Sequence, residues 1–151
     1  MNGEIENLKL YGTDKKLVSF KDLIGKPIFL YFFPAAFTDV CTDHLCKINE
    51  FIAYFNKYNI LSFGISTDSI FSLIELKKKN SLQFELLSDI NKAAIAAFDV
   101  IEEEFAFDMK NVAKRSVFIF NKEGQQIYSE VMKNPGQTPD FDSAKKIIAE
   151  L

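Results

Sequence analysis

Apolar residues gather in short runs along the chain, and the longest of these runs predicts a buried strand at residues 28–33. Its six side chains are all aliphatic or aromatic, which is typical of a central strand that helices cover on both faces. Pro27 opens this run, and Pro34 ends it because proline has no N–H to donate to a sheet. A second apolar run at residues 60–66 predicts a neighbouring strand.

Between these two strands, apolar side chains recur at helical spacing and predict a helix at residues 42–57. Residues three or four apart share one face of a helix, so these side chains form a buried stripe. The stripe consists of Leu45, Ile48, Ile52 and Phe55.

The second half of the chain continues the alternation of strands and helices. Asp68 or Ser69 is expected to cap a helix that ends in three lysines, where cations suit the negative end of the helix dipole. After a short apolar segment at residues 84–87, Asp89 or Asn91 starts another helix.

Turn signals predict two hairpins, one near each end of the chain. A Gly-Thr-Asp turn lies near the N-terminus, and residues 121–124, which include a glycine, separate strands at 116–120 and 126–130. Residues 101–111 are expected to form an acidic, aromatic loop. An amphipathic helix at residues 143–151 ends the chain.

Together these elements predict an α/β fold with a mixed central sheet flanked by helices. The predicted order is hairpin, β, α, β, α, α, β, β, α. Alternating strand and helix units imply parallel pairing, while the late hairpin adds antiparallel strands. With 151 residues the chain is long enough for a full core, so we expect a single domain that spans residues 1–151.

The composition is ordinary for a globular protein and narrows the range of partners. Hydrophobic residues make up 48% of the chain and charged residues 26%. The net charge of −3, from 18 basic and 21 acidic residues, favours neither nucleic acid nor an anionic membrane as a partner. The N-terminal segment contains glutamates and no long apolar run, and no segment approaches a transmembrane span. We therefore expect no export signal and a cytoplasmic location.

The candidate chemistry centres on two cysteines, Cys41 and Cys46, which lie five residues apart. Cys41 follows the strand at residues 28–33 and falls at the expected start of a helix. The unpaired N–H groups and the positive dipole end of a helix N-terminus favour a thiolate. In a chain without an export signal, two such cysteines indicate redox or metal chemistry. The alternative for Cys41 is a small buried hydrophobic residue.

The spacing around Cys41 resembles the active-site signature of a known family. Pro34, Thr38 and Cys41 give the pattern Pro-x-x-x-Thr-x-x-Cys, which resembles the signature of the peroxiredoxins, thiol peroxidases with a thioredoxin-like fold. Cys41 and Cys46 give Cys-x-x-x-x-Cys, which is similar to the Q-type subgroup, also called bacterioferritin comigratory proteins. The similarity runs from about Leu8 to the C-terminus and includes three further segments in the family's order: GISTDSIFSLIELKKKN, LLSDINKAAIAAFDV and KRSVFIFNKEGQQIY.

This resemblance implies a reaction and its reagents. The Cys41 thiolate would attack hydrogen peroxide or a small organic hydroperoxide and become a sulfenic acid. Cys46 would resolve the sulfenic acid as an intramolecular disulfide, and a thioredoxin-like or other thiol reductant would recycle the enzyme. No cofactor is implied, and relatives of this type occur as monomers or homodimers. The alternatives are a one-cysteine peroxiredoxin resolved by an external thiol and a peroxide-sensing redox relay.

Helix geometry sets a condition on any bond between Cys41 and Cys46. Residues five apart on a helix are separated by about 7.5 Å along its axis and by about 140° around it. A disulfide needs Cα atoms within about 7 Å and facing Cβ atoms. We therefore expect the first turns of the helix to unwind before the bond forms.

The resemblance also assigns roles to three other residues. It implies that Thr38 hydrogen-bonds the sulfur and the incoming peroxide, and that Pro34 shapes the loop and shields the sulfur. It places Arg115, the only arginine in the chain, beside the reactive sulfur, where the planar guanidinium offers a fixed fork of charged donors. The alternatives are a helix or turn cap for Thr38, a strand end for Pro34 and a surface ion pair for Arg115.

Several features separate this chain from related patterns. His44, the sole histidine, occupies a position where relatives more often have Glu or Gln, which would support a hydrogen-bond network near the arginine. A neutral histidine can still donate and accept hydrogen bonds there, and the alternative is an exposed position on the helix surface. A metal-binding module that used Cys41, His44 and Cys46 would be incomplete for zinc. A thioredoxin would have Cys-x-x-Cys and a proline just before the strand near Arg115, and this chain has neither.

Overall fold

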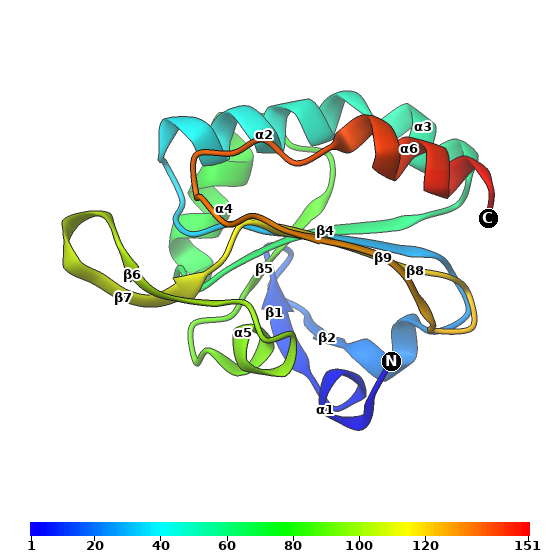
Figure 1. Ribbon diagram of the computed structural model, residues 1–151, viewed down its shortest axis with the longest axis horizontal. Coiled ribbons are helices and arrows are strands. Elements are labelled where there is room, and N and C mark those ends of the chain that lie inside the picture. The colour runs from blue at the N-terminus through cyan, green and yellow to red at the C-terminus, as the bar shows by residue number, and fades with distance from the viewer.

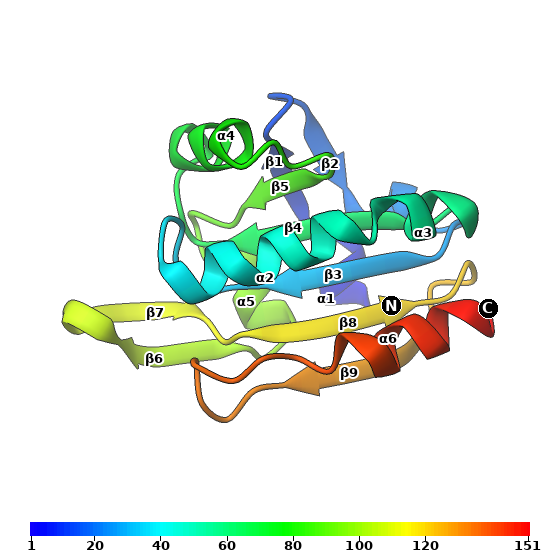
Figure 2. The ribbon, with the colours of Figure 1, turned by 90° about the horizontal axis from the view of Figure 1, so that it is seen from above.

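The sheet at the centre of the molecule has seven strands, and helices cover both of its faces (Figures 1 and 2). The computed structural model describes residues 1–151. In order across the sheet, the strands are β2 (Leu17–Ser19), β1 (Lys9–Gly12), β5 (Glu85–Ser88), β4 (Leu61–Ser66), β3 (Ile28–Phe32), β8 (Ser116–Phe120) and β9 (Gln126–Val131).

The pairing of β3 confirms the predicted mixed sheet. β3 pairs in parallel with β4 and antiparallel with β8. β1 and β2 form the predicted N-terminal hairpin, and β8 and β9 form the second one. In the turn of that second hairpin, Gly124 has a φ of +80°, a conformation that glycine adopts without strain.

The longer helices, including the one that carries both cysteines, lie on one face of the sheet, whereas smaller helices cover the opposite face (Figures 1 and 2). The first group comprises α2 (Asp39–Glu50), α3 (Ile52–Lys57), α4 (Ile70–Lys79) and α6 (Phe141–Ala149). The second group comprises α1 (Gly3–Glu6), α5 (Ala93–Ala97) and the 3₁₀ helix η1 (Phe20–Leu23). None of the helices combines the length and the apolar character needed to cross a lipid bilayer.

A hydrophobic core lies on each side of the sheet, and β3 contributes to both. Successive side chains of a strand point to opposite faces, so the apolar run that begins at β3 alternates between the two cores. The residues that enter the core under α2 are Phe29, Tyr31 and Phe33, and those that enter the opposite core are Ile28, Leu30 and Phe32. Tyr31 therefore lies on the same side of the sheet as the helix that carries both cysteines.

The helix that follows β3 differs from the prediction in its start and in its continuity. α2 begins at Asp39, three residues before the predicted start, and a second helix, α3, follows it. Phe51 separates the two because its ψ of 3° is not helical and its N–H donates to the carbonyl of Ile48 at 2.9 Å. As a result, Cys41 lies inside the first turn of α2.

The prediction of a loop at residues 101–111 is wrong. Strands β6 (Ile101–Phe105) and β7 (Met109–Ala113) form a separate antiparallel hairpin that projects from the body of the molecule (Figure 1). The short 3₁₀ helix η2 (Ala106–Asp108) makes its turn, with left-handed φ values at Phe107 and Asp108. Its sequence lacks the usual signals, because glutamate is uncommon in strands and no glycine marks the turn.

Candidate active site

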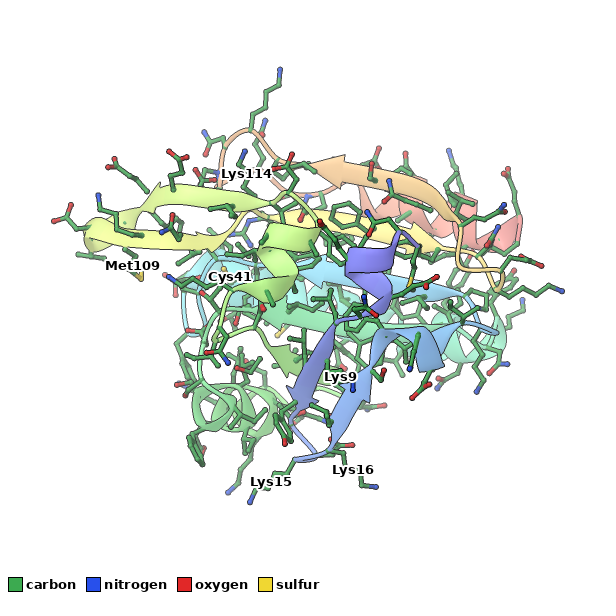
Figure 3. The ribbon with its side chains drawn as sticks, turned by 90° about the horizontal axis from the view of Figure 1, so that it is seen from below. Lys9, Lys15, Lys16, Cys41, Met109 and Lys114 are labelled. Atoms are coloured by element: carbon green, nitrogen blue, oxygen red, sulfur yellow. The ribbon has the colours of Figure 1, made fainter.

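Cys41 is fully buried and lies in the first turn of α2, close to the helix start that the sequence predicts. Strand β3 and the six residues after it, Phe33–Thr38, bring the chain to this point; we call residues 33–38 the thiol loop. Figure 3 labels Cys41 near the base of the β6–β7 hairpin, which ends just before Lys114. The sulfur therefore lies below the surface, at the end of α2 where the N–H groups of the first turn are unpaired.

Arg115 lies beside Cys41, and its side chain makes four hydrogen bonds, one of them to His44. Its Nη2 donates to Sγ of Cys41 at 3.3 Å, its Nη1 to Oη of Tyr31 at 2.5 Å, and its Nε to the carbonyl of Pro135 at 2.7 Å. The residue is only 2% exposed, and none of the ion pairs in the structure includes it. The alternative of a surface ion pair for Arg115 is therefore wrong.

The guanidinium of Arg115 remains charged in this buried place. Burial alone lowers the pKa of Arg115, but the neighbouring Tyr31 and Cys41 raise it above its ordinary value overall. Burial also raises the pKa of Tyr31 well above its ordinary value, so that side chain stays a neutral phenol. The charged Arg115 therefore donates to a neutral phenol at Tyr31 and to the sulfur of Cys41.

His44 completes this network and is buried, with 1% of its surface exposed. Its Nδ1 lies 2.9 Å from Oη of Tyr31 and 3.3 Å from Nη1 of Arg115, and its Nε2 lies 3.2 Å from Oγ1 of Thr138. Because an arginine can only donate, Nδ1 must be an acceptor, and the proton of the neutral ring is on Nε2. The alternative of an exposed His44 is wrong, since the ring joins Arg115 and Tyr31 to the loop that contains Thr138.

The protonation state of His44 leads to a prediction about stability in acid. Burial, and then the charge of Arg115, lower the pKa of His44 to about 4. An unfolded histidine takes up its proton near pH 6.5, so the stabilising contribution of neutral His44 is complete above that pH and is lost as the pH falls toward about 4. The free energy of unfolding should decrease by about 1.4 kcal/mol per pH unit within this window on account of this one group.

Denaturant unfolding of the wild type and of His44→Gln, measured from about pH 7 to about pH 5, tests this expectation. Glutamine can accept a hydrogen bond and donate another, but it does not titrate. The variant should therefore lose less stability than the wild type over this range. An identical pH dependence in the two proteins would show that His44 does not have the lowered pKa.

Thr38 and Pro34 lie in the thiol loop next to the start of α2. Pro34 is buried. Thr38 occupies the N-cap position of α2, but its side chain makes no capping hydrogen bond. Its hydroxyl instead donates to the carbonyl of Ala35 at 3.2 Å, and no hydrogen bond joins it to Cys41. Thr38 is therefore the N-cap residue of α2 by position, but its hydroxyl bonds within the preceding turn and not to a helix N–H. Its hydroxyl oxygen keeps free acceptor capacity.

Cys46 lies farther along α2 and is half-buried. Its Sγ is 3.9 Å from Oδ1 of Asn80, and it borders a surface cavity of about 440 Å³ that Phe37 and Lys79 also line. Both cysteines are free thiols. The reduced protein thus keeps Cys46 on an intact helix, against the end of α4 rather than against Cys41.

The three residues of the metal-binding alternative are not brought together. Cys41 contacts Arg115, His44 contacts Tyr31, and Cys46 contacts Asn80. No group of three His, Cys, Asp or Glu side chains is arranged to hold a metal ion.

Three parts of this site are absent from the sequence interpretation. They are the phenol of Tyr31, the hydroxyl of Thr138 and the carbonyl of Pro135. Tyr31 could have been found, because it is the one hydroxyl-bearing side chain in an otherwise apolar strand. Thr138 and Pro135 lie in a loop that gave no such signal.

Comparison with known proteins places this site in a class of enzyme. The family model described as the AhpC/TSA family matches residues 1–128. The chain therefore belongs to the AhpC/TSA family, the peroxiredoxins, and is a thiol peroxidase that takes a peroxide as substrate and a thiol as reductant. Within this family it is most like the bacterioferritin comigratory, or Q-type, proteins.

Two curated relatives illustrate this similarity. Peroxiredoxin Bcp of Bacillus subtilis is 32% identical over 123 residues, which cover 80% of this chain and 78% of that protein. The putative peroxiredoxin bcp of Coxiella burnetii is 32% identical over 114 residues, which cover 74% of this chain and 76% of that protein.

Solved structures confirm the thioredoxin-like fold. A cysteine-to-serine mutant of peroxiredoxin Q from Xylella fastidiosa has a TM-score of 0.84 and 22% identity, with 99% of this chain and 91% of that chain covered. The bacterioferritin comigratory protein of Xanthomonas campestris has a TM-score of 0.83 and 24% identity, with 99% and 93% covered.

Proposed function

We propose that this peroxiredoxin reduces hydrogen peroxide and small organic hydroperoxides at Cys41, and that Cys46 then resolves the oxidised sulfur as an intramolecular disulfide. The observation that carries the proposal is the 3.3 Å contact between Nη2 of Arg115 and Sγ of the buried Cys41, at the N-terminal end of α2. A fixed cation and the helix dipole both favour a thiolate there. The Xanthomonas campestris relative is described by its alkyl peroxide reduction activity, which supports organic hydroperoxides as substrates.

In the first step the sulfur of Cys41 attacks the peroxide. The thiolate donates an electron pair to the terminal oxygen of ROOH, the O–O bond breaks, and RO⁻ leaves and takes a proton from solvent. The sulfur is oxidised to a sulfenic acid, which keeps the terminal OH. Arg115 stays next to the reacting atoms throughout, so it stabilises the negative charge as that charge moves from sulfur to the leaving oxygen.

We assign Thr38 to the incoming peroxide and Pro34 to the protection of the sulfur. A hydroxyl that already donates its proton to the carbonyl of Ala35 can only accept from a peroxide O–H. That direction of bonding suits a protonated peroxide and orients its terminal oxygen. Pro34 is buried and has no N–H of its own, so it covers the site without competing for the peroxide oxygen.

In the second step Cys46 attacks the sulfenic sulfur of Cys41, a disulfide forms, and water leaves. Within an intact α2 the two residues are about 7.5 Å apart along the axis and face directions about 140° apart, which a disulfide cannot span. The first turns of α2 must therefore open. The missing side-chain cap at Thr38 and the long contact of 3.9 Å between Cys46 and Asn80 favour such an opening. The hydrogen bonds of Cys41 and His44 oppose it, so they must break as the turns open.

Recycling requires a dithiol partner that reduces the disulfide in a two-electron exchange. We propose a thioredoxin-like reductant, which would leave with the disulfide and restore both thiols. We also propose a cytoplasmic location, where such reductants keep thiols reduced, and a monomer or homodimer. The two cores that share one sheet support a single functional domain of residues 1–151.

Replacement of Cys46 tests its assignment as the resolving residue. Cys46→Ser should form a sulfenic acid at Cys41 at the wild-type rate, because residue 46 does not contact the reacting sulfur. The variant should not progress to an internal disulfide, and Cys41 should over-oxidise to sulfinic acid more readily. Mass analysis of each protein after a small excess of hydrogen peroxide measures all three quantities.

The wild type, treated in the same way, is the control. If it shows only a persistent sulfenic acid and no Cys41–Cys46 bond, Cys46 is not the resolving residue. The chain would then work as a one-cysteine peroxiredoxin that an external thiol resolves.

A further inference from the structure

The thiol loop is held from outside by one carboxylate, that of Asp68. Asp68 lies between β4 and α4, and its Oδ2 accepts hydrogen bonds from the N–H of Ala36 at 2.8 Å and from Oγ of Ser66 at 2.6 Å. Ala36 lies in the middle of the thiol loop, between Pro34 and Thr38. In Figure 2 the connection from β3 to α2 and the connection from β4 to α4 lie at the same end of the sheet.

Asp68 does not have the capping role that its sequence position suggests. Ser69 is the N-cap of α4, and its side chain accepts from the N–H of Ser72 at 3.2 Å. No lysine or arginine pairs with Asp68. Its charged oxygen is instead used for the two bonds to the loop and to the sheet, and such charge-assisted bonds are stronger than neutral ones.

The sheet in turn holds Asp68 in place. Ser66, at the end of β4, also accepts from the N–H of Asp68 at 3.3 Å, and Oγ of Ser88, at the end of β5, donates to the carbonyl of Asp68 at 2.6 Å. Both serines are buried. The carboxylate is therefore attached to the ends of two neighbouring strands, which makes it a rigid support.

The thiol loop has little other support near its centre. Among residues 34–38, Ala36 provides the one backbone N–H that donates to another element. Phe37, the next residue, is half-exposed and has a left-handed φ of 63°, which a non-glycine residue adopts only when its surroundings impose it. The bond from Ala36 to Asp68 therefore fixes the turn that brings Thr38 to the start of α2.

We propose that Asp68 is a positioning residue for the peroxide step. By holding the N–H of Ala36, it keeps Pro34 and Thr38 in place around Cys41 without touching the reacting atoms itself. This inference rests on the function proposed above for Cys41 and Thr38. Loss of the bond should loosen the loop while the contact between Arg115 and Cys41 remains, so the first step slows and the later steps do not.

The test is the second-order rate constant for oxidation of Cys41 by hydrogen peroxide in the full-length protein. Asp68→Ala should slow this step by about tenfold, because small misplacements of groups around a reacting centre cost factors of this order or more. Asp68→Asn should stay within a few-fold of the wild type. Both bonds go to the same oxygen, Oδ2, and an amide keeps one acceptor oxygen in that place.

Two further variants separate positioning from general loss of stability. Ser69→Ala removes the side-chain cap of α4 at the residue after Asp68, and it leaves the hydrogen bond from Ala36 to Asp68 intact. The rate of the peroxide step should therefore not change. Ser66→Ala removes the hydroxyl that fixes the carboxylate and should slow the step by a smaller factor than Asp68→Ala. It also keeps the test informative if Asp68→Ala does not fold.

Wild-type rates in both Asp68→Ala and Ser66→Ala would overturn the inference, as would equal slowing in Ser69→Ala or a failure of Asp68→Asn to restore the rate. Failure of the proposed function is a different result, since peroxide turnover would then persist in Cys41→Ser. A slow Asp68→Ala, a fast Asp68→Asn and a fast Ser69→Ala together would establish Asp68 as a positioning residue.

Discussion

Replacement of Cys41 by serine is expected to abolish peroxide consumption while the fold is retained. Serine nearly matches cysteine in size, so it should fit the fully buried place at the start of α2. Its hydroxyl does not ionise appreciably near neutral pH, even next to the guanidinium of Arg115. Removal of the nucleophile from an enzyme of this kind costs roughly 10⁴-fold or more in rate. Peroxide consumption in the presence of a dithiol reductant measures the effect.

The matched control for this experiment is Cys46→Ser, which makes the same chemical change five residues away. That variant should consume its first equivalent of peroxide at the wild-type rate, whereas Cys41→Ser should consume none. Circular dichroism of both variants checks that the fold is intact. Normal turnover by Cys41→Ser would remove Cys41 from the mechanism.

Arg115→Lys is expected to slow the peroxide step by roughly 10²-fold or more, which is the usual cost of losing one oriented donor at an anion-stabilising site. The guanidinium serves four partners at once, with Nη2 on Cys41, Nη1 on Tyr31 and His44, and Nε on the carbonyl of Pro135. A lysine ammonium is a single point and cannot reproduce that planar fork. The charge would remain, but its orientation toward the sulfur would be lost.

The second-order rate constant with hydrogen peroxide, measured in a single turnover, is the relevant quantity. Lys114→Gln is the control, because it removes a positive charge from the adjacent residue without touching the hydrogen bonds of Arg115. This control should react at the wild-type rate. An Arg115→Lys rate equal to that of the wild type would show that the guanidinium fork does not take part in the peroxide step.

The central part of the fold follows from local pattern. The apolar run at residues 28–33 is a central strand because both faces of the sheet are covered, and the spacing of Leu45 and Ile48 places a helix against it. The break at Phe51 could not be predicted, because the apolar spacing continues through it. The β6–β7 hairpin was missed because its strands carry glutamates and its turn relies on left-handed residues other than glycine.

The sequence likewise predicted some residues of the candidate site and missed others. The spacing of Pro34, Thr38 and Cys41 located the thiol, and the only arginine in the chain, Arg115, was placed beside it through the resemblance to peroxiredoxins. The bond between His44 and Thr138 could not be predicted, because Thr138 is 94 residues away in sequence and nothing in its loop marks it.

The role of Asp68 was hidden for a different reason. An aspartate just before an apolar helix usually caps that helix, and here Ser69 does so instead. Only the three-dimensional arrangement shows that the carboxylate reaches the amide of Ala36, 32 residues away.

In the proposed mechanism, peroxide first oxidises Cys41 to a sulfenic acid, and Cys46 then forms a disulfide with Cys41. Rapid mixing of the reduced protein with one equivalent of hydrogen peroxide tests this sequence of steps most directly. Samples are quenched at successive times, and the masses of the peptides that contain Cys41 and Cys46 are determined. The account predicts a transient gain of one oxygen at Cys41, followed by a Cys41–Cys46 disulfide and the loss of that oxygen as water. Oxygen that appears first on Cys46, or a Cys41 that stays a thiol while peroxide disappears, would contradict it.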